Sequence, residues 1–157
     1  MHSAEAKWAP DVARAIIRAH ATQEGPLLPI LHALQAQFGA ILPEAERLIA
    51  EELNISRADI HGVVSFYHDF RHDPTGRHVL KLCRAEACQA MGSEAQAERL
   101  LEALGLAWGG TTADGRLTVE AVYCLGLCAT APAILLDNTP HGRVDEAALM
   151  ALVAEVA

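Results

Sequence analysis

The chain has 157 residues, of which 52% are hydrophobic, and a formal charge of −8 at neutral pH. This length allows one ordinary domain or a compact domain with a smaller appendage, and the hydrophobic content excludes a disordered chain. The acidic charge is spread over both halves of the sequence, which argues against nucleic acid and anionic membranes as partners.

The N-terminus predicts no secretory signal, because Met1 to Pro10 contain no basic segment followed by an apolar run. No stretch approaches the roughly 18 apolar residues that a membrane-spanning helix needs, so we expect no direct membrane insertion. We therefore expect a cytoplasmic protein with reduced thiols. In that compartment a four-cysteine pattern more often binds metal or serves catalysis than forms structural disulfides.

Residues 1–72 are predicted to form an N-terminal α-helical bundle with short connections. A fourth helix starts at Ser56, which with Asp59 resembles a capping box, and carries apolar side chains as far as Phe70. No motif in this segment has a chemical interpretation of its own. The three earlier helices are delimited by residues typical of helix ends: Pro10, Gly25, Pro26, Gly39, Pro43 and Asn54.

Residues 73–157 are predicted to form a second, α/β part. Its order is strand, helix, strand, strand, short strand and helix, which suits a sheet covered by helices. In the strand at 117–123, alternation predicts Leu117 and Tyr123 on the buried side and Thr118 on the other. The remaining expected elements are a strand at 78–82, a helix capped by Ser93 and ended by Gly105, strands at 133–136 and 143–144, and a last helix capped by Asp145.

All four cysteines lie in two local pairs. Cys83 and Cys88 have four residues between them, and Cys124 and Cys128 have three. Each pair begins where a predicted strand ends and continues in the loop beyond it. If the two strands are neighbours that point the same way, the loops meet at one edge of the sheet and the four thiols can form a single metal site.

Three chemistries compete for these thiols. Zinc is possible, although a zinc knuckle usually has two residues between its ligands. A thiol–disulfide exchange site is disfavoured, because Cys-x-x-Cys is absent. An iron–sulfur cluster of the [2Fe-2S] type needs four thiolates, two per iron, on loops that wrap a wider object than one ion. Small residues that let backbone amides approach the sulfurs favour the cluster: Ala85, Ala87, Gly126, Ala129 and Ala131.

Other conspicuous residues have simpler interpretations. We interpret His61, His68 and His72, on the predicted fourth helix and its end, as surface or interface residues, although Rieske-type clusters use histidine. Arg84 lies between Cys83 and Cys88. It would tune a bound cluster, meet a carboxylate of a partner, or be an ordinary solvated arginine. Pro132 opens a strand and could follow a cis peptide bond.

Aromatic residues near the end of the fourth helix, Phe66, Tyr67 and Phe70, are interpreted as core or interface. The sequence has no Gly-rich phosphate loop, paired carboxylates or Ser/His/Asp arrangement. No substrate site, nucleotide site or catalytic residue is therefore expected. If the cysteines hold an iron–sulfur cluster, the chemistry of the chain is one-electron transfer.

Taken together, the motifs resemble a known family, the small thioredoxin-like [2Fe-2S] subunit that accompanies the NADH-oxidising flavoprotein of respiratory complex I. The same family supplies subunits to NAD-reducing hydrogenases and NAD-dependent formate dehydrogenases. The resemblance extends from about Leu27 to the C-terminus. The segments that carry it are 61–67 (HGVVSFY), 74–78 (PTGRH), the Cys83/Cys88 pair, 111–116 (TTADGR), 124–128 (CLGLC) and 131–132 (AP).

This resemblance implies a thioredoxin-like [2Fe-2S] ferredoxin domain after the helical segment. It implies one cluster, with Cys83 and Cys88 on one iron and Cys124 and Cys128 on the other. It also implies a flavoprotein partner that holds FMN and NAD. Within the family, segments 83–89 and 122–126 look closest to the gamma subunit of cytosolic, molybdenum-containing NAD-dependent formate dehydrogenase, whose molybdenum cofactor lies in another subunit. The alternatives are complex I, an NAD-reducing hydrogenase and, outside the family, a zinc-stabilised interaction module.

Overall fold

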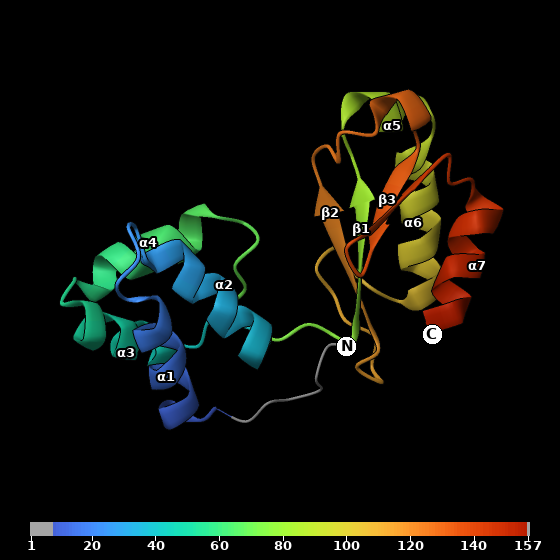
Figure 1. Cartoon of the computed structure of the whole chain (residues 1–157). Coiled ribbons are helices and arrows are strands. Elements are labelled where there is room, and N and C mark those ends of the chain that lie inside the picture. The colour runs from blue at the N-terminus through green and yellow to red at the C-terminus, as the bar shows by residue number, and fades with distance from the viewer. Residues whose placement is uncertain (1–7, 157) are drawn as a thin grey trace. The chain divides into compact units, whose positions relative to one another are not determined.

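The computed structural model describes residues 8–156 and divides into two compact units, with the boundary in the chain between Pro74 and Thr75 (Figure 1). Among the described residues, every regular element of the first unit is a helix, and the second unit contains a sheet. None of the helices in the described range is long and apolar enough to cross a membrane.

Over residues 8–74 the first unit has four helices: α1 (Pro10–His20), α2 (Leu27–Phe38), α3 (Pro43–Leu53) and α4 (Arg57–Phe66). The ends of α2 and α3 and the start of α4 follow the predicted signals. Gly39 and Asn54 adopt the left-handed conformation that ends α2 and α3, and the Ser56 hydroxyl accepts a hydrogen bond from the Asp59 N–H at the start of α4. The helices share one core: Ala13, Ile17, Ile30, Leu31, Leu34, Phe38, Ile41, Ala45, Leu48, Ile49, Ile60, Val64 and Phe70.

The prediction that the fourth helix carries Phe70 was wrong. Helix α4 ends at Phe66, and Tyr67 has an extended backbone. The Gln35 side chain holds the chain that follows, because its amide donates to the Asp69 carbonyl at 2.7 Å and accepts from the Arg71 N–H at 2.8 Å. Phe70 reaches the core from this non-helical segment, and periodicity alone could not separate that placement from a helical one.

The second unit contains a four-stranded sheet in the order β2-β1-β3-β4. Strands β1 (His78–Cys83) and β2 (Leu117–Val122) are parallel neighbours, as the predicted shared site requires. Strands β3 (Ala133–Leu136) and β4 (Thr139–Gly142) continue the sheet in antiparallel pairs. The helical elements are α5 (Glu86–Ala90), α6 (Ser93–Leu104), the 3-10 turn η1 (Cys128–Thr130) and α7 (Glu146–Val156).

Helices α6 and α7 lie beside each other along the sheet (Figure 1) and share its core. The Arg99–Glu146 ion pair, with both N–O distances at 2.8 Å, joins them. Asp145 caps α7 as predicted, because its carboxylate accepts from the Ala148 N–H at 2.8 Å. The core residues are Leu80, Leu82, Ala97, Leu100, Leu101, Leu117, Val119, Ile134, Leu136, Val144, Leu149 and Val153.

Two local predictions in this unit were wrong at turns. The last strand is Thr139–Gly142 rather than 143–144, because Asp137 and Asn138 both adopt positive φ and close a two-residue hairpin. Ser93 is the first residue of α6, whose N-cap is Gly92, and the buried Ser93 hydroxyl has no hydrogen-bond partner.

The alternation predicted for β2 was also wrong in part. Thr118 is buried, at 3% exposure, whereas Tyr123 is 72% exposed. The Thr118 hydroxyl is buried because it is bonded on two sides: it accepts from the Gly76 N–H at 2.7 Å and lies 2.7 Å from the Thr111 hydroxyl. A satisfied hydroxyl can therefore occupy an interior position that an apolar residue would otherwise take.

Candidate metal centre

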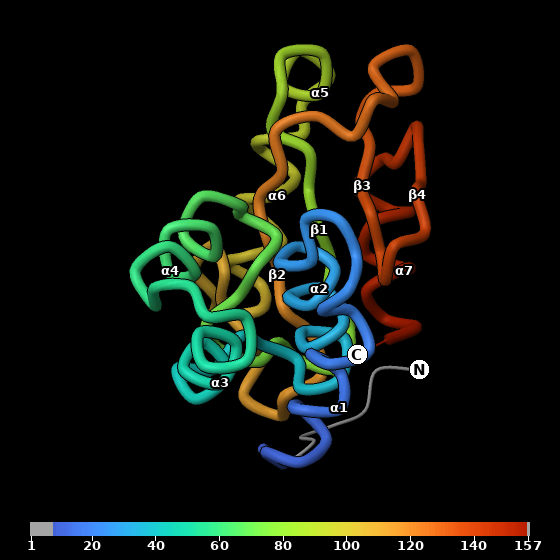
Figure 2. The backbone as a smooth tube through the Cα atoms, turned by 60° about the vertical axis from the view of Figure 1, so that its left-hand side comes forward, coloured from blue at the N-terminus to red at the C-terminus, as the bar shows by residue number. Residues whose placement is uncertain are grey.

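The parallel pairing of β1 and β2 places the two cysteine-bearing segments together. Cys83 is the last residue of β1 and pairs in register with Val122, the last residue of β2. The next residue, Arg84, donates its backbone N–H to the Val122 carbonyl at 2.8 Å. The two cysteine-bearing segments therefore leave the sheet at the same end. Figures 1 and 2 show α5 and the segment after β2 gathered at this end.

The first pair is buried. Cys83 is 3% exposed and Cys88 is 2% exposed, and both pack against Ala133 at the start of β3. Cys88 lies on α5 rather than in the predicted loop. The sequence offered a signal for this helix in Ala85-Glu86-Ala87, which combines good helix formers with an acidic residue in the first turn.

The second pair is exposed and is shaped by its backbone. Cys124 has a φ of 100°, an uncommon value for a residue with a side chain, and Cys128 opens η1. The two Sγ atoms are 3.8 Å apart, and the Gly126 N–H donates to the Cys124 sulfur at 3.3 Å. Gly126 itself has a φ of 75°, which glycine adopts without strain.

The two pairs interact with each other as well. Burial alone would raise the pKa of the Cys83 thiol, but the backbone N–H of Ala85, the Cys88 thiol and the N–H groups of Leu125 and Cys124 together lower it. Two of these donors come from the other cysteine segment. Segments that are remote in sequence thus direct thiols and amide donors to one place.

Close approach has the opposite effect on two other thiols. Burial is the largest cause that raises the pKa of Cys88, and its contact with Cys83 is the second. The neighbouring Cys124 raises the pKa of Cys128. Several thiolates held this close repel one another, and a bound cation would offset that repulsion.

This geometry fits a group that takes thiolates in pairs. A tetrahedral metal with metal–sulfur bonds of about 2.3 Å holds two thiolates about 3.8 Å apart, which matches the Cys124–Cys128 separation. Within residues 8–156, no three His, Cys, Asp or Glu side chains form a group that could hold one metal ion. The donor set of four thiols with backbone N–H groups aimed at sulfur suits a [2Fe-2S] cluster, whose sulfurs accept such bonds.

Arg84, which the sequence left undecided, is bound within its own unit. Its guanidinium makes two hydrogen bonds to Glu94, at 3.0 and 2.5 Å, and lies 4.9 Å from the ring centroid of Trp108. The Glu94 carboxylate raises the pKa of Arg84. Sequence reasoning missed Glu94 and Trp108, because they lie 10 and 24 residues after Arg84 and no local pattern links the three.

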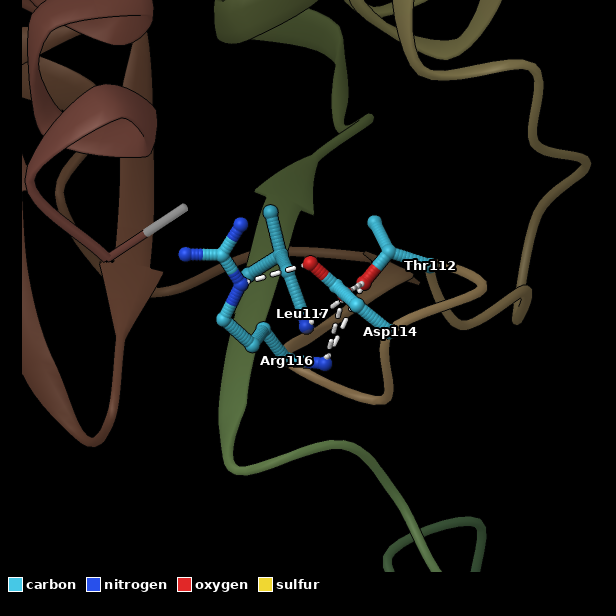
Figure 3. Close-up of polar contacts among 4 residues, drawn as sticks. All are labelled: Thr112, Asp114, Arg116 and Leu117. Atoms are coloured by element: carbon cyan, nitrogen blue, oxygen red, sulfur yellow. Dashed lines mark hydrogen bonds and ion pairs between the residues drawn. The ribbon is translucent and has the colours of Figure 1, made fainter.

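A polar loop precedes β2 (Figure 3). The Thr112 hydroxyl accepts from the N–H groups of Arg116 and Leu117, at 3.2 and 3.1 Å, and donates to the Asp114 carboxylate. The hydrogen bonds from Thr112 and Arg116 hold the pKa of Asp114 well below its usual value. This loop also supplies the Gly115 and Arg116 carbonyls that accept from the start of β1, so it helps to align the two parallel strands.

The remaining candidates are spread over the molecule. Phe66 and Tyr67 are 73% and 44% exposed, whereas Phe70 is buried. His61 lies on α4, as predicted, and its ring is 3.1 Å from the buried Glu46 carboxylate. The Ala131–Pro132 peptide bond is cis, the geometry that the sequence left open.

The fold and the thiols define the class: an α/β domain in which four cysteine thiols converge at the end of a parallel strand pair. The family model of the thioredoxin-like [2Fe-2S] ferredoxins matches residues 13–157. The chain belongs to this family, and it has the mixed α/β thioredoxin-like fold. The family implies an iron–sulfur cluster.

Named relatives come from two kinds of complex. The chain is 39% identical to a NADH-quinone oxidoreductase subunit of Pseudomonas aeruginosa over 114 residues, covering 73% of this chain and 69% of the relative. It is 35% identical to a NADH-quinone oxidoreductase subunit of Thermus thermophilus, covering 95% of this chain and 77% of the relative. It is 31% identical to the HndA subunit of the NADP-reducing hydrogenase of Solidesulfovibrio fructosivorans, covering 85% and 78%.

A crystal structure of an NAD+-reducing [NiFe]-hydrogenase in its H2-reduced state is similar as well. The superposition has a TM-score of 0.72 at 28% identity and covers 83% of this chain. This chain spans only 22% of the hydrogenase chain that it matches.

Proposed function

We propose that this chain is an electron-transfer subunit that carries one [2Fe-2S] cluster. Cys83 and Cys88 would bind one iron, and Cys124 and Cys128 the other. The observation that carries this proposal is the convergence of all four thiols, with backbone N–H donors, at the end of β1 and β2.

When bound, such a cluster supplies a one-electron carrier. The chain's own residues hold the four sulfurs and direct amide N–H groups at them, which stabilises the anionic form of the site. The buried Cys83/Cys88 pair keeps one side of the site dry, while the exposed Cys124/Cys128 pair leaves the other side open. We propose that this open side faces the partner flavoprotein, since the shortest electron path would cross it.

For the parent complex, we propose a cytosolic, molybdenum-containing NAD-dependent formate dehydrogenase. There, formate would be oxidised to CO2 in another subunit, and this chain would lie beside the FMN subunit that reduces NAD. Segments 83–89 and 122–126 support this choice through their resemblance to the gamma subunit of such enzymes. Neither this chain nor its flavoprotein partner would hold the molybdenum cofactor.

A second candidate is the equivalent subunit of NADH:quinone oxidoreductase, supported by the 39% identity to the Pseudomonas protein. An NAD-reducing hydrogenase is the third, supported by the crystal-structure similarity. Affinity purification of the tagged chain from its native host separates the three. A molybdenum-containing subunit supports formate dehydrogenase, membrane-arm subunits support complex I, and a nickel-containing subunit supports hydrogenase.

The cluster itself is tested on the isolated full chain purified without oxygen. We expect about two irons per chain, visible absorbance and an EPR signal after reduction. Stoichiometric zinc without iron would instead identify a zinc-stabilised module, and thiol-reductase activity would identify a thiol enzyme. Cys124→Ser should lose or distort the cluster, whereas Tyr123→Phe, next to it in the chain, should keep iron content and the signal. An unchanged Cys124→Ser signal would refute the ligand assignment.

A further inference from the structure

Arg84, which follows Cys83, is held more firmly than an ordinary surface arginine. Arg84 has a side-chain exposure of 25%, and its two hydrogen bonds to Glu94 form a planar, two-point contact. Trp108 lies against its guanidinium, and Trp108 in turn packs on the core of the unit. The positive charge therefore has a fixed position.

Glu94 is fixed as well. It is the second residue of α6, where a carboxylate is stabilised by the free N–H groups of the helix start, and its side chain is 35% exposed. The backbone of Arg84 adds a third restraint, since its N–H donates to the Val122 carbonyl. The cation that directly follows Cys83 and the anion paired with it on α6 thus lie at defined positions.

We propose that Arg84 and Glu94 act as a paired charge that sets the reduction potential of the cluster. This inference depends on the proposed function, because it requires a cluster on Cys83. Arg84 is a positioning and tuning residue, not a ligand, and Glu94 partly cancels its charge.

The physical reason is that reduction adds one negative charge to an already anionic site. A fixed cation beside a ligand favours the reduced state, and a fixed anion disfavours it. Both side chains are partly buried, so solvent screens them less than it screens ordinary surface charges. Within the intact pair the two effects largely offset each other, and removing one member exposes the effect of the other.

The test is a redox titration of the full chain, followed by the EPR signal of the reduced cluster. Glu94→Gln leaves the cation uncompensated and should raise the potential. Arg84→Gln leaves the anion and should lower it. We expect each variant to change the ratio of reduced to oxidised cluster by about five- to tenfold at fixed solution potential, where tenfold is about 59 mV for a one-electron couple.

Matched controls separate this effect from net charge and from structural support. Arg99→Gln and Glu146→Gln each remove one member of a second two-point ion pair, also in the sheet-containing unit, and change the net charge by the same amount as the test variants. They should leave the potential unchanged. Arg84→Lys keeps the charge and should restore a potential close to that of the unaltered chain, even though lysine cannot reproduce the two-point contact.

Opposite shifts in the two variants, reduced at high salt, would support the proposal. Shifts in the same direction, or shifts no larger than those of the control pair, would overturn it, because a merely structural role predicts no change of sign. Iron content is measured on each variant. An unaltered chain that binds no iron would refute the proposed function itself, and the tuning role with it.

Discussion

Gly142, the last residue of β4, offers a direct test of how tightly the sheet holds the second cysteine pair. A Cβ at this position would lie 2.5 Å from Oγ1 and 2.8 Å from Cβ of Thr130, in the turn that Cys128 opens. The Thr130 Oγ1 would have to retreat by about 0.9 Å to reach ordinary van der Waals distance. Thr130 cannot do so freely, because its hydroxyl donates to the Leu127 carbonyl at 3.1 Å and its carbonyl accepts from the Arg143 N–H at 2.6 Å.

Gly142→Ala should therefore lower the free energy of unfolding of the sheet-containing unit by about 1–3 kcal/mol, the usual cost of overpacking. The control is Gly62→Ala on α4, where a Cβ meets nothing within 4 Å. Because alanine is the better helix former, that change should stabilise the helical unit by up to about 1 kcal/mol.

The two tryptophans make each unit observable separately, since Trp8 packs on the helical core and Trp108 on the sheet core. Urea unfolding of the apo chain would be followed by Trp108 fluorescence in a Trp8→Phe background, and by Trp8 fluorescence in a Trp108→Phe background. The second cysteine pair is read separately, from the iron content and EPR signal of the reconstituted Gly142→Ala chain. Equal stability of Gly142→Ala and its background would show that the turn yields easily, and would refute the proposed rigidity.

Three further changes test the polar contacts that align the fold. Thr118→Val should cost about 1–3 kcal/mol in urea unfolding, because it leaves the buried Gly76 N–H without its acceptor. Asp114→Asn should destabilise the chain most at neutral pH; since the folded-state pKa of Asp114 is depressed, the difference from the unaltered chain should shrink as pH falls below 3.8, the ordinary value for this carboxyl. Gln35→Ala should speed amide hydrogen exchange at residues 69–71, and unchanged exchange there would contradict the clamping role of this side chain.

Features with a strong local cause could be predicted from the sequence. The ends of α2 and α3 were predictable because Gly39 and Asn54 tolerate positive φ at low cost. The parallel pairing of β1 and β2 was the condition for a shared cysteine site, and the structure meets that condition. Two apolar runs separated by a helix are compatible with such a parallel crossover. The convergence of the cysteine pairs was a geometric consequence of that pairing.

Features that depend on distant partners could not be predicted. The helix that holds Cys88 was missed for a separate, local reason: its five residues are too few to show periodicity, and only their composition indicates a helix. Thr118 appears polar in the sequence, yet its hydroxyl is satisfied by groups that only the folded chain brings near. The Arg84–Glu94–Trp108 contact joins the end of β1 to the start of α6 and the loop beyond it, so no local window contains it.

The two halves of the proposed metal site depend on different physical forces. Cys83 and Cys88 are positioned by burial against Ala133, so their placement follows from the hydrophobic core. Cys124 and Cys128 are exposed and are positioned by backbone geometry: a positive φ at Cys124, the Gly126 N–H bond and the turn packed against Gly142. Loss of core packing should therefore disturb the first pair before the second, whereas changes at the η1–β4 contact should disturb the second alone. The geometry of this less buried half therefore depends most on the local backbone being held in place. It is also the half that a partner can approach, because Cys124 and Cys128 are exposed.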